Sequence, residues 1–390
     1  METGVPIFKK LRLVCLAPLI ALVIPSTLLA QTTADSDHNL LDQVALLQNA
    51  IEKYEQIDQA GGWEVIPDGP LIEPGDRSDR VEAVTQRLIK TGDFKGSFFR
   101  SSLYVGSLVR GVKHFQTRNG LDPDGLIGPA TLKELNKPVA QKISILKSNL
   151  ARAKTLRTRL PENYVLVNVA GYELVAVKDN KVQIHSRVVV GTTENQTPIF
   201  NDKIRLIELN PYWNVPTSIS AKELIPLMAQ YPDYLDYNHM QLSKVQDNGL
   251  YQKVSYQDYN WSKLAPGEAY KFRMRQEPGP WNALGEVKII FPNQYDVYLH
   301  DTPQKDFFKA ARRSFSHGCI RVQKALDLAL YLVSNDSGNW TKREFKAALK
   351  SEENQTVNLK TPIPIFLIYN TAWVDAKGLT QFRPDIYKRD

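Results

Sequence analysis

The chain has 390 residues and a net charge of +7, and 43% of its residues are hydrophobic and 23% charged. This length and composition predict two or three folded domains and exclude a disordered chain or a single small domain. The positive balance suits an acidic or polyanionic partner such as a cell wall or a membrane surface. No recognised nucleic-acid motif is present, so we expect no nucleic-acid partner.

The first 30 residues have the layout of a secretory signal peptide. Three basic residues precede an apolar run at 13–30, and Ala30 offers a cleavage site. The run is close to the length that spans a bilayer, so a retained leader that tethers the chain to the inner membrane is the alternative. Cleavage would remove Cys15 and leave Cys319 as the only thiol, which then forms either an intermolecular bridge or a free reactive group.

Helical spacing of apolar residues follows the leader. It predicts an N-terminal helical scaffold segment at 31–69 and a small three-helix domain at 70–137. In the latter, Asp79 and Glu82 have capping-box spacing. Residues 138–161 predict a basic amphipathic helix that acts as a linker or scaffold, and its charges suit a solvated face better than contact with a wall polymer or lipid.

The pattern then changes to Val- and Ile-rich segments bounded by Gly, Asn and Asp, which predict consecutive β-strands. We expect a β-rich domain at 162–337 with an insert at about 221–264, which is long enough to form a lid subdomain over a cleft. Residues 338–390 predict a helix, capped by Thr341 and Glu344, and a β-hairpin that complete the scaffold and the β-rich domain. The expected fold class is α+β.

The segment FSHGCIRV at 315–322 surrounds Cys319 with candidate catalytic groups. A thiol attacks a carbonyl as the thiolate, and at an ordinary pKa of ~8.5 it is only partly ionised at neutral pH. A nearby histidine can take the proton and return it to a leaving amine, and both His300 and His317 are candidates. Gly318 allows a sharp bend, after which the main-chain N–H of Cys319 can stabilise an oxyanion. A buried, inert cysteine is the alternative.

Ser316 and Arg321 are expected to hold the loop or to bind a substrate carboxylate, because a guanidinium matches that group bidentately. Tyr298 is a further substrate-binding candidate. We expect no cofactor and no metal. A zinc site at the thiol and the two imidazoles is the alternative, but structural zinc usually takes four ligands.

Two regions resemble known families. The stretch VRGVKHFQTRNGLDPDGLIGPATLKEL at 109–135 resembles the peptidoglycan-binding module of exported wall enzymes. LHDTP, followed by SHGCIRV, resembles the YkuD-type catalytic domain of L,D-transpeptidases. The fuller set, PGPWNALGEVKIIFPNQYDVYLHDTP and AWVDAKGLTQFRPDIY, resembles the YcbB branch of that family. Together the resemblances cover most of residues 70–390.

The resemblance implies a reaction on peptidoglycan stem peptides. The cysteine would cleave the bond between diaminopimelate and D-alanine, release D-alanine, and pass the acyl group to the amine of a second diaminopimelate, which gives a 3→3 cross-link. It implies an exported enzyme in the periplasm of a Gram-negative bacterium, with stem peptides and glycan as partners and other cell-wall synthesis enzymes alongside. The module at 70–137 would bind the wall or serve only as a scaffold.

Carried over residue by residue, the resemblance implies Cys319 as the nucleophile and His300 as the proton donor and acceptor. The carbonyl of Asp301 would orient the imidazole, and His317 and Gly318 would shape the oxyanion site. An L,D-carboxypeptidase or other cysteine peptidase shares the acylation step and differs only in using water as the acceptor. A non-catalytic wall-binding protein is the remaining alternative.

Overall fold

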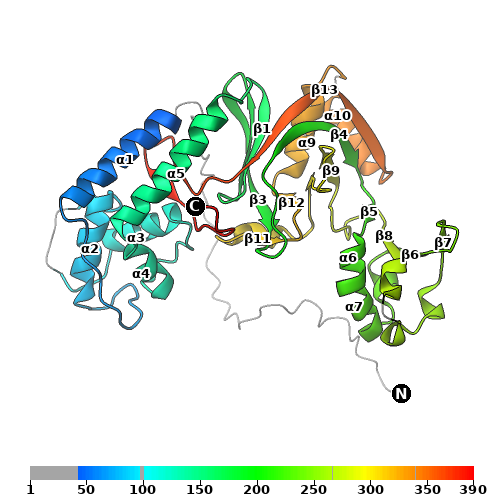
Figure 1. Ribbon diagram of the computed structural model, residues 1–390, viewed down its shortest axis with the longest axis horizontal. Helices are drawn as coiled ribbons and strands as arrows, with labels where there is room; N and C mark the ends of the chain where they lie inside the picture. Colours follow the sequence, from blue (N-terminus) through cyan, green and yellow to red (C-terminus); the bar gives the residue numbers. More distant parts are fainter. Residues whose placement is uncertain (1–42, 97–100, 266, 339) are drawn as a thin grey trace. The chain divides into compact units, whose positions relative to one another are not determined.

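The computed structural model describes residues 43–96, 101–265, 267–338 and 340–390, and the predicted leader lies outside them. The described chain combines helices with a large β-sheet, so the predicted α+β class is confirmed (Figure 1). Across these residues, no helix combines the length and the apolar character needed to cross a membrane.

Five helices form the N-terminal part of the described chain (Figure 1). They are α1 (Gln43–Gln59), α2 (Arg80–Thr91), α3 (Ser107–Arg118), α4 (Pro129–Leu135) and α5 (Val139–Arg157). Helices α2, α3 and α4 bury one apolar face each in a shared core that includes Val84, Phe115 and Leu132. Helix α1 packs on α5 in a separate core. The helical periodicity of the sequence therefore marks buried faces correctly.

The two expected helix caps have different outcomes. Thr341 forms a full capping box with Glu344 at the start of α10 (Lys342–Lys350). The capping box expected at Asp79 is wrong, because that side chain makes no capping bond at the start of α2. Asp79 has helical dihedral angles (φ −62°, ψ −19°), whereas an N-cap side chain reaches back from an extended residue such as Thr341 (φ −79°, ψ 155°).

One lysine of the basic helix is not solvated. Lys142 is 1% exposed; its ammonium group contacts Glu134, donates to Asn119 Oδ1 at 2.8 Å, and lies 3.9 Å from the ring centroid of Phe382. Burial lowers the pKa of Lys142 to about 7. The expectation that the basic residues of this helix are solvated is therefore wrong for Lys142. This side chain is buried and connects α5 with α4 and with Phe382 near the C-terminus.

The main sheet has nine strands in the order β11-β3-β12-β10-β9-β4-β13-β1-β2. They are β1 (Tyr164–Asn168), β2 (Glu173–Lys178), β3 (Lys181–Gly191), β4 (Asn201–Leu209), β9 (Val287–Ile290), β10 (Leu299–His300), β11 (Ser314–Ser316), β12 (Ile320–Val322) and β13 (Gln355–Ile368). An additional pairing of β2 with β3 closes the sheet on itself. This closure encloses one core, against which α9 (Ala325–Ser334) and α10 pack, while β11 is paired with β3 alone.

The C-terminal strands differ from the expected hairpin. Strand β13 lies between β1 and β4 within the main sheet, parallel to β1 and antiparallel to β4. The hairpin itself is shorter and consists of β14 (Ala372–Val374) and β15 (Thr380–Phe382). The apolar run at 363–368 is compatible with either an arm of a hairpin or a buried strand of a large sheet. Only its pairing with strands far away in the sequence decides between these two structures.

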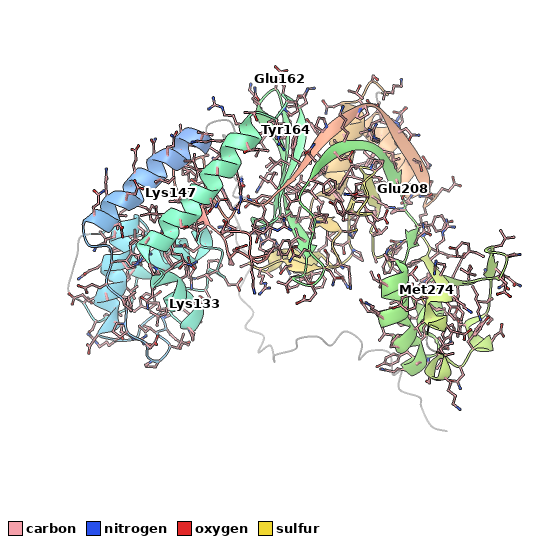
Figure 2. All side chains as sticks on the ribbon, in the orientation of Figure 1. Lys133, Lys147, Glu162, Tyr164, Glu208 and Met274 are labelled. Atoms are coloured by element: carbon pink, nitrogen blue, oxygen red, sulfur yellow. The ribbon has the colours of Figure 1, made fainter. Side chains whose placement is uncertain are left out.

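The chain between β4 and β9 forms a second, smaller sheet with its own helices (Figure 2, where Met274 is labelled). Its strands, in the order β5-β8-β6-β7, are β5 (Trp213–Asn214), β8 (Phe272–Gln276), β6 (Met240–Val245) and β7 (Tyr251–Lys253). A π-helix, η2 (Ser220–Leu224), leads into α7 (Ile225–Gln230). An independent apolar core includes Leu224, Met228 and Met274. We call residues 213–276 the insert subdomain; it extends beyond the expected lid at both ends.

Candidate active site

The register of three adjacent strands separates an apolar face from a polar one. Strand β10 lies between β9 and β12, with Leu299 opposite both Ile289 and Ile320. These three side chains are fully buried in the main core. Because neighbouring residues of a strand point to opposite faces, His300 and its partners Arg321 and Lys288 project from the other face.

Cys319 directly precedes β12 and joins this polar face. It stands two residues before Arg321, and the N–H of Ile320 donates to the Tyr298 carbonyl at 3.0 Å, which sets Cys319 beside Tyr298. The side chain is partly exposed, and its Sγ lies 3.7 Å from the main-chain oxygen of Asp296. The thiol and His300 therefore occupy the same face of neighbouring strands, and the thiol is not sealed in the core.

The protein environment keeps the resting thiol protonated. Burial raises the pKa of Cys319 above its ordinary value, and the negative charge of Asp296 adds to the effect. Hydrogen bonds from Tyr298 and the positive charge of Lys288 lower the same pKa, but they do not outweigh burial. The Cys319 side chain is thus a neutral thiol at rest, which would have to lose its proton before it could act as a nucleophile.

His300 is 5% exposed, and its tautomer follows from its hydrogen bond. Nδ1 lies 2.5 Å from the main-chain oxygen of Asp301. A carbonyl oxygen can only accept, so Nδ1 carries the hydrogen and Nε2 keeps the lone pair. Burial, together with the charges of Arg321 and Lys288, lowers the pKa of His300 to about 3. The imidazole is therefore neutral at physiological pH and has its basic nitrogen free of this bond.

The loop before the thiol needs glycine for its conformation. Gly318 has φ 115°, in the region that side chains rarely adopt, whereas an added Cβ would come no closer than 3.8 Å to another atom. Ser316, 3% exposed, donates from its hydroxyl to the Cys319 carbonyl at 2.6 Å and accepts from the Gly318 N–H at 3.2 Å. Ser316 therefore holds the loop, one of its two expected roles. Since the Gly318 N–H is engaged, the N–H of Cys319 is the better candidate oxyanion donor.

A buried hydroxyl network supports the loop from beneath. Thr197 is 0% exposed, and its hydroxyl donates to the Gly318 carbonyl at 2.8 Å and accepts from the Gly191 N–H at 2.9 Å. The Tyr387 hydroxyl donates to the Gly191 carbonyl at 2.7 Å and accepts from the Thr197 N–H at 3.1 Å. The Thr197 hydroxyl thus ties the loop at 316–319, which we call the catalytic loop, to Gly191, and the Tyr387 hydroxyl holds Gly191 and Thr197 in turn.

His317 contacts the insert subdomain. Its Nε2 lies 2.7 Å from Glu223 Oε1 in the π-helix η2, and the two side chains are 44% and 48% exposed. This contact joins the residue two places before the thiol to a segment 94 residues away. The structure gives His317 a partner outside the sheet, while its expected part in the oxyanion site stays a prediction.

Arg321 has an unused donor on the polar face. Its Nη1 lies 3.3 Å from Gln304 Oε1, and its guanidinium is 5.4 Å from the ring centroid of Phe307. Its Nε is buried and, within the described part of the chain, has no hydrogen-bond partner. An unsatisfied buried donor is costly. Because this nitrogen is buried, the expected contact of Arg321 with a substrate carboxylate stays a prediction.

Tyr298 faces the same group of charges. Lys288 Nζ lies 4.5 Å from its ring centroid and 3.5 Å from Glu208 on β4, which is labelled in Figure 2. Burial raises the pKa of Tyr298, and the nearby thiol raises it further. The phenol therefore remains a hydrogen-bond donor next to the sulfur, and its expected contact with substrate stays a prediction.

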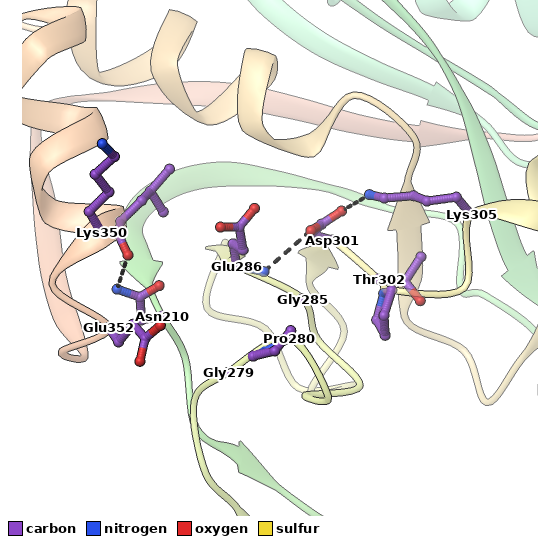
Figure 3. Close-up of a pocket in the computed structure, with 12 residues that line it drawn as sticks. Asn210, Gly279, Pro280, Gly285, Glu286, Asp301, Thr302, Lys305, Lys350 and Glu352 are labelled. Carbon is purple, nitrogen blue, oxygen red and sulfur yellow. Dashed lines mark hydrogen bonds and ion pairs between the residues drawn. The ribbon is translucent and has the colours of Figure 1, made fainter.

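The Asp301 carboxylate has partners of its own. Its carboxylate pairs with Lys305 and accepts from the Glu286 N–H at 3.3 Å, as the dashed lines in Figure 3 show. A Cβ on Gly285 would come within 2.3 Å of this carboxylate, so the approach requires glycine. The group lines a pocket of about 560 Å³ together with Asn210, Thr302 and other residues. The side chain thus anchors the turn whose carbonyl holds His300.

Several residues of this site are absent from the sequence prediction. Thr197 and Glu223 contact the catalytic loop from distant parts of the chain, and the main-chain oxygen of Asp296 contacts the thiol. Tyr387 contacts Thr197 and not the loop itself. They have no local pattern that links them to FSHGCIRV. In the described ranges, no three His, Cys, Asp or Glu residues are grouped as metal ligands would be.

Comparisons with known proteins agree with this architecture. The family described as "L,D-transpeptidase catalytic domain" (YkuD) matches residues 162–365, more than half of the chain. The family described as "Putative peptidoglycan binding domain" matches residues 77–135.

A curated protein of Haemophilus influenzae, named "Putative L,D-transpeptidase", is 30% identical over 255 residues. The match covers 65% of this chain and 50% of that protein, so the chain spans about half the length of this curated relative. A solved L,D-transpeptidase from Xylanimonas cellulosilytica is 15% identical, with 77% of this chain and 99% of that chain covered and a TM-score of 0.23. One from Mycobacterium smegmatis is 11% identical, with 53% and 58% covered and a TM-score of 0.26. On the match over residues 162–365, the chain belongs to the YkuD family of L,D-transpeptidase catalytic domains.

Proposed function

We propose that this chain is an L,D-transpeptidase that acts on peptidoglycan stem peptides through Cys319. The observation that carries the proposal is the parallel register of β10 and β12, in which Leu299 is opposite Ile320. This register gives the thiol and the His300 imidazole a common polar face. Neutral Nε2 of His300 is then available to accept the proton that the thiol must lose.

In the first half-reaction the sulfur attacks the carbonyl carbon between diaminopimelate and D-alanine while His300 Nε2 takes the thiol proton. The carbonyl electron pair moves onto oxygen, and the Cys319 N–H donates to the resulting oxyanion. When the carbon–nitrogen bond breaks, His300 returns the proton to the departing nitrogen. D-alanine leaves, and the acyl group remains on the sulfur as a thioester.

In the second half-reaction the side-chain amine of another diaminopimelate attacks the thioester. His300 Nε2 takes a proton from this amine, the carbon–sulfur bond breaks, and the thiolate recovers the proton. The new amide is a 3→3 cross-link. The low pKa of His300 assists proton transfer to the departing nitrogen in the first half-reaction and to the thiolate in the second. A buried imidazolium next to Arg321 and Lys288 gives up its proton readily.

The proposal assigns a role to each part of the chain. Residues 162–337, completed by 338–390, form the catalytic domain. The insert subdomain at 213–276, which contains the lid expected at about 221–264, acts as the lid. Residues 70–137 bind the wall or act as a scaffold, with the helical segments at 31–69 and 138–161 as supports. We further propose export to the periplasm of a Gram-negative bacterium, by a leader that is either cleaved or kept as an inner-membrane tether.

The test is mass spectrometry of the products formed from purified disaccharide tetrapeptide. The proposed function predicts D-alanine and a dimer joined through two diaminopimelate residues. Free tripeptide without dimer, even with added amine acceptor, would identify an L,D-carboxypeptidase. Absence of any D-alanine release, with binding to wall sacculi retained, would identify a non-catalytic wall-binding protein.

A further inference from the structure

A groove of about 670 Å³ lies beside α5, where the end of β13 meets the segment before β4. Its apolar walls come from Leu156, Ile199, Phe200 and Phe366. Three arginines, Arg152, Arg159 and Arg389, also line it. Arg152 belongs to α5, and Arg159 lies two residues beyond the end of this helix. The groove therefore combines an apolar surface with concentrated positive charge.

The positive charge of the groove is only partly neutralised. Arg152 pairs with Asp390 at 2.7 Å. The Arg389 side chain donates instead to the neutral amide of Gln196 at 3.2 Å. Arg159 has no carboxylate within ion-pair distance among the residues described. Because guanidinium groups bind carboxylates bidentately, Arg159 and Arg389 favour an acidic ligand.

A residue held by one arginine of the groove lies next to the catalytic loop. Gln196, which Arg389 holds, has its main-chain oxygen 3.8 Å from the position that a Cβ on Gly318 would take. The next residue, Thr197, donates from its side chain to the Gly318 carbonyl. Thus the arginine side of the groove continues into the segment that supports the nucleophile.

A second path links the groove to the thiol itself. The ring of Phe200 packs against Tyr295, with 5.2 Å between centroids. The residue after Tyr295 is Asp296, whose carbonyl contacts the Cys319 thiol. On its other flank, the catalytic loop meets the insert subdomain through His317. The insert subdomain and the groove therefore approach the nucleophile through different neighbours.

We propose that this groove binds the stem peptide that serves as acyl acceptor, with a carboxylate of that peptide on Arg159 and Arg389. The inference rests on the proposed function and names the acceptor subsite that the second half-reaction needs. Aliphatic atoms of the acceptor lie on the apolar wall, and its side-chain amine reaches the thioester past Phe200 and Tyr295.

The test compares Arg159→Gln, in the turn after α5, with Arg157→Gln, a matched change at the last residue of α5 and outside the groove. Donor is the disaccharide tetrapeptide, and acceptor is a tripeptide stem ending in diaminopimelate, which lacks D-alanine and cannot act as donor. At sub-saturating acceptor, Arg159→Gln should lower the ratio of cross-linked to hydrolysed product about tenfold, the loss expected for one charge-assisted contact. Arg157→Gln should keep the wild-type ratio. Amidating the acceptor carboxylates should lower the ratio in the wild type far more than in Arg159→Gln.

A separate binding measurement keeps the inference independent of turnover. The full-length Cys319→Ala protein should bind the tripeptide about tenfold more weakly when Arg159→Gln is added. Equal ratios and equal affinities for Arg159→Gln and Arg157→Gln would overturn the acceptor groove. If Arg159→Gln lowered the cross-linked and the hydrolysed product equally, the acceptor groove would also be overturned, because the groove would then bind the donor stem. Absence of D-alanine release by the wild type would instead contradict the proposed function.

Discussion

The hydroxyl of Thr197 donates to the carbonyl of Gly318 at a distance of 2.8 Å, from a position that is fully buried. Tyr387 in turn accepts from the Thr197 N–H and donates to the Gly191 carbonyl. Neither residue is assigned contact with substrate. Their effect on the reaction is to fix the loop from which the Cys319 side chain and N–H project.

Tyr387→Phe should therefore lower kcat about tenfold for D-alanine release while leaving KM close to wild type. It leaves the buried Thr197 N–H without its acceptor, which should reduce the free energy of unfolding by about 1–3 kcal/mol. Steady-state kinetics and denaturant unfolding measure the two effects. Tyr164→Phe, which removes the hydroxyl of a buried tyrosine on β1, is the control for loss of a hydroxyl away from the catalytic loop. A wild-type kcat in Tyr387→Phe would remove the positioning role.

Alkylation of Cys319 by iodoacetamide should report a neutral resting thiol. Burial raises its pKa, so the rate should rise about tenfold per pH unit through neutrality and level off only above an ordinary thiol pKa of ~8.5. Peptide mapping of the adduct assigns the rate to Cys319. Lys288→Met removes a charge that lowers this pKa and should move the profile to still higher pH. A rate already constant between pH 5 and 7 would indicate a preformed thiolate–imidazolium pair instead.

His300 should make the fold less stable in acid. Its pKa is lowered to about 3 in the folded protein, whereas an unfolded histidine has its pKa near 6.5, so the unfolded chain binds the extra proton between these values. Stability from this group is present above pH 6.5 and is lost as the pH falls, by about 2 kcal/mol between pH 7 and pH 5. Urea unfolding at both pH values measures the change. Between pH 7 and pH 5, the free energy of unfolding of His300→Asn should fall by about 2 kcal/mol less than that of the wild type. The same pH dependence in both proteins would refute a neutral, buried imidazole.

Gly318→Ala should cost activity through backbone conformation, because an alanine Cβ has room at this position. Holding alanine at φ 115° costs roughly 1–3 kcal/mol, and the loop is expected to relax and displace the Cys319 N–H. We expect a clear fall in kcat with a circular dichroism spectrum like that of the wild type. Ala347→Gly, on the exposed side of α10, is a control for a mild change elsewhere. Normal kcat in Gly318→Ala would show that the left-handed conformation is not needed.

The sequence predicts the parts of this protein that repeat a local pattern. Helical spacing marks the buried residues of α2 and α3, and the Thr341 capping box forms as expected. The same reasoning fails at Asp79, where helical dihedral angles rule out the cap, and at Lys142, which a carboxylate and a ring from other elements draw into the interior. Local pattern cannot report such tertiary contacts.

In the candidate site, too, the sequence predicts the residues that belong to local motifs and misses those that depend on tertiary contacts. Cys319, Gly318 and His300 belong to short motifs, so the sequence identifies them. Thr197 and Glu223 reach the same loop from 121 and 94 residues away, and their contacts depend on how the sheet and the insert subdomain close. No periodicity or spacing in the chain records those distances.

Intact-protein mass spectrometry during turnover of disaccharide tetrapeptide tests the central claim most directly. The account predicts a transient adduct equal to the substrate minus D-alanine, located on Cys319 by peptide mapping and absent from Cys319→Ala. D-alanine release by Cys319→Ala at the wild-type rate, or an adduct on any other residue, would contradict it.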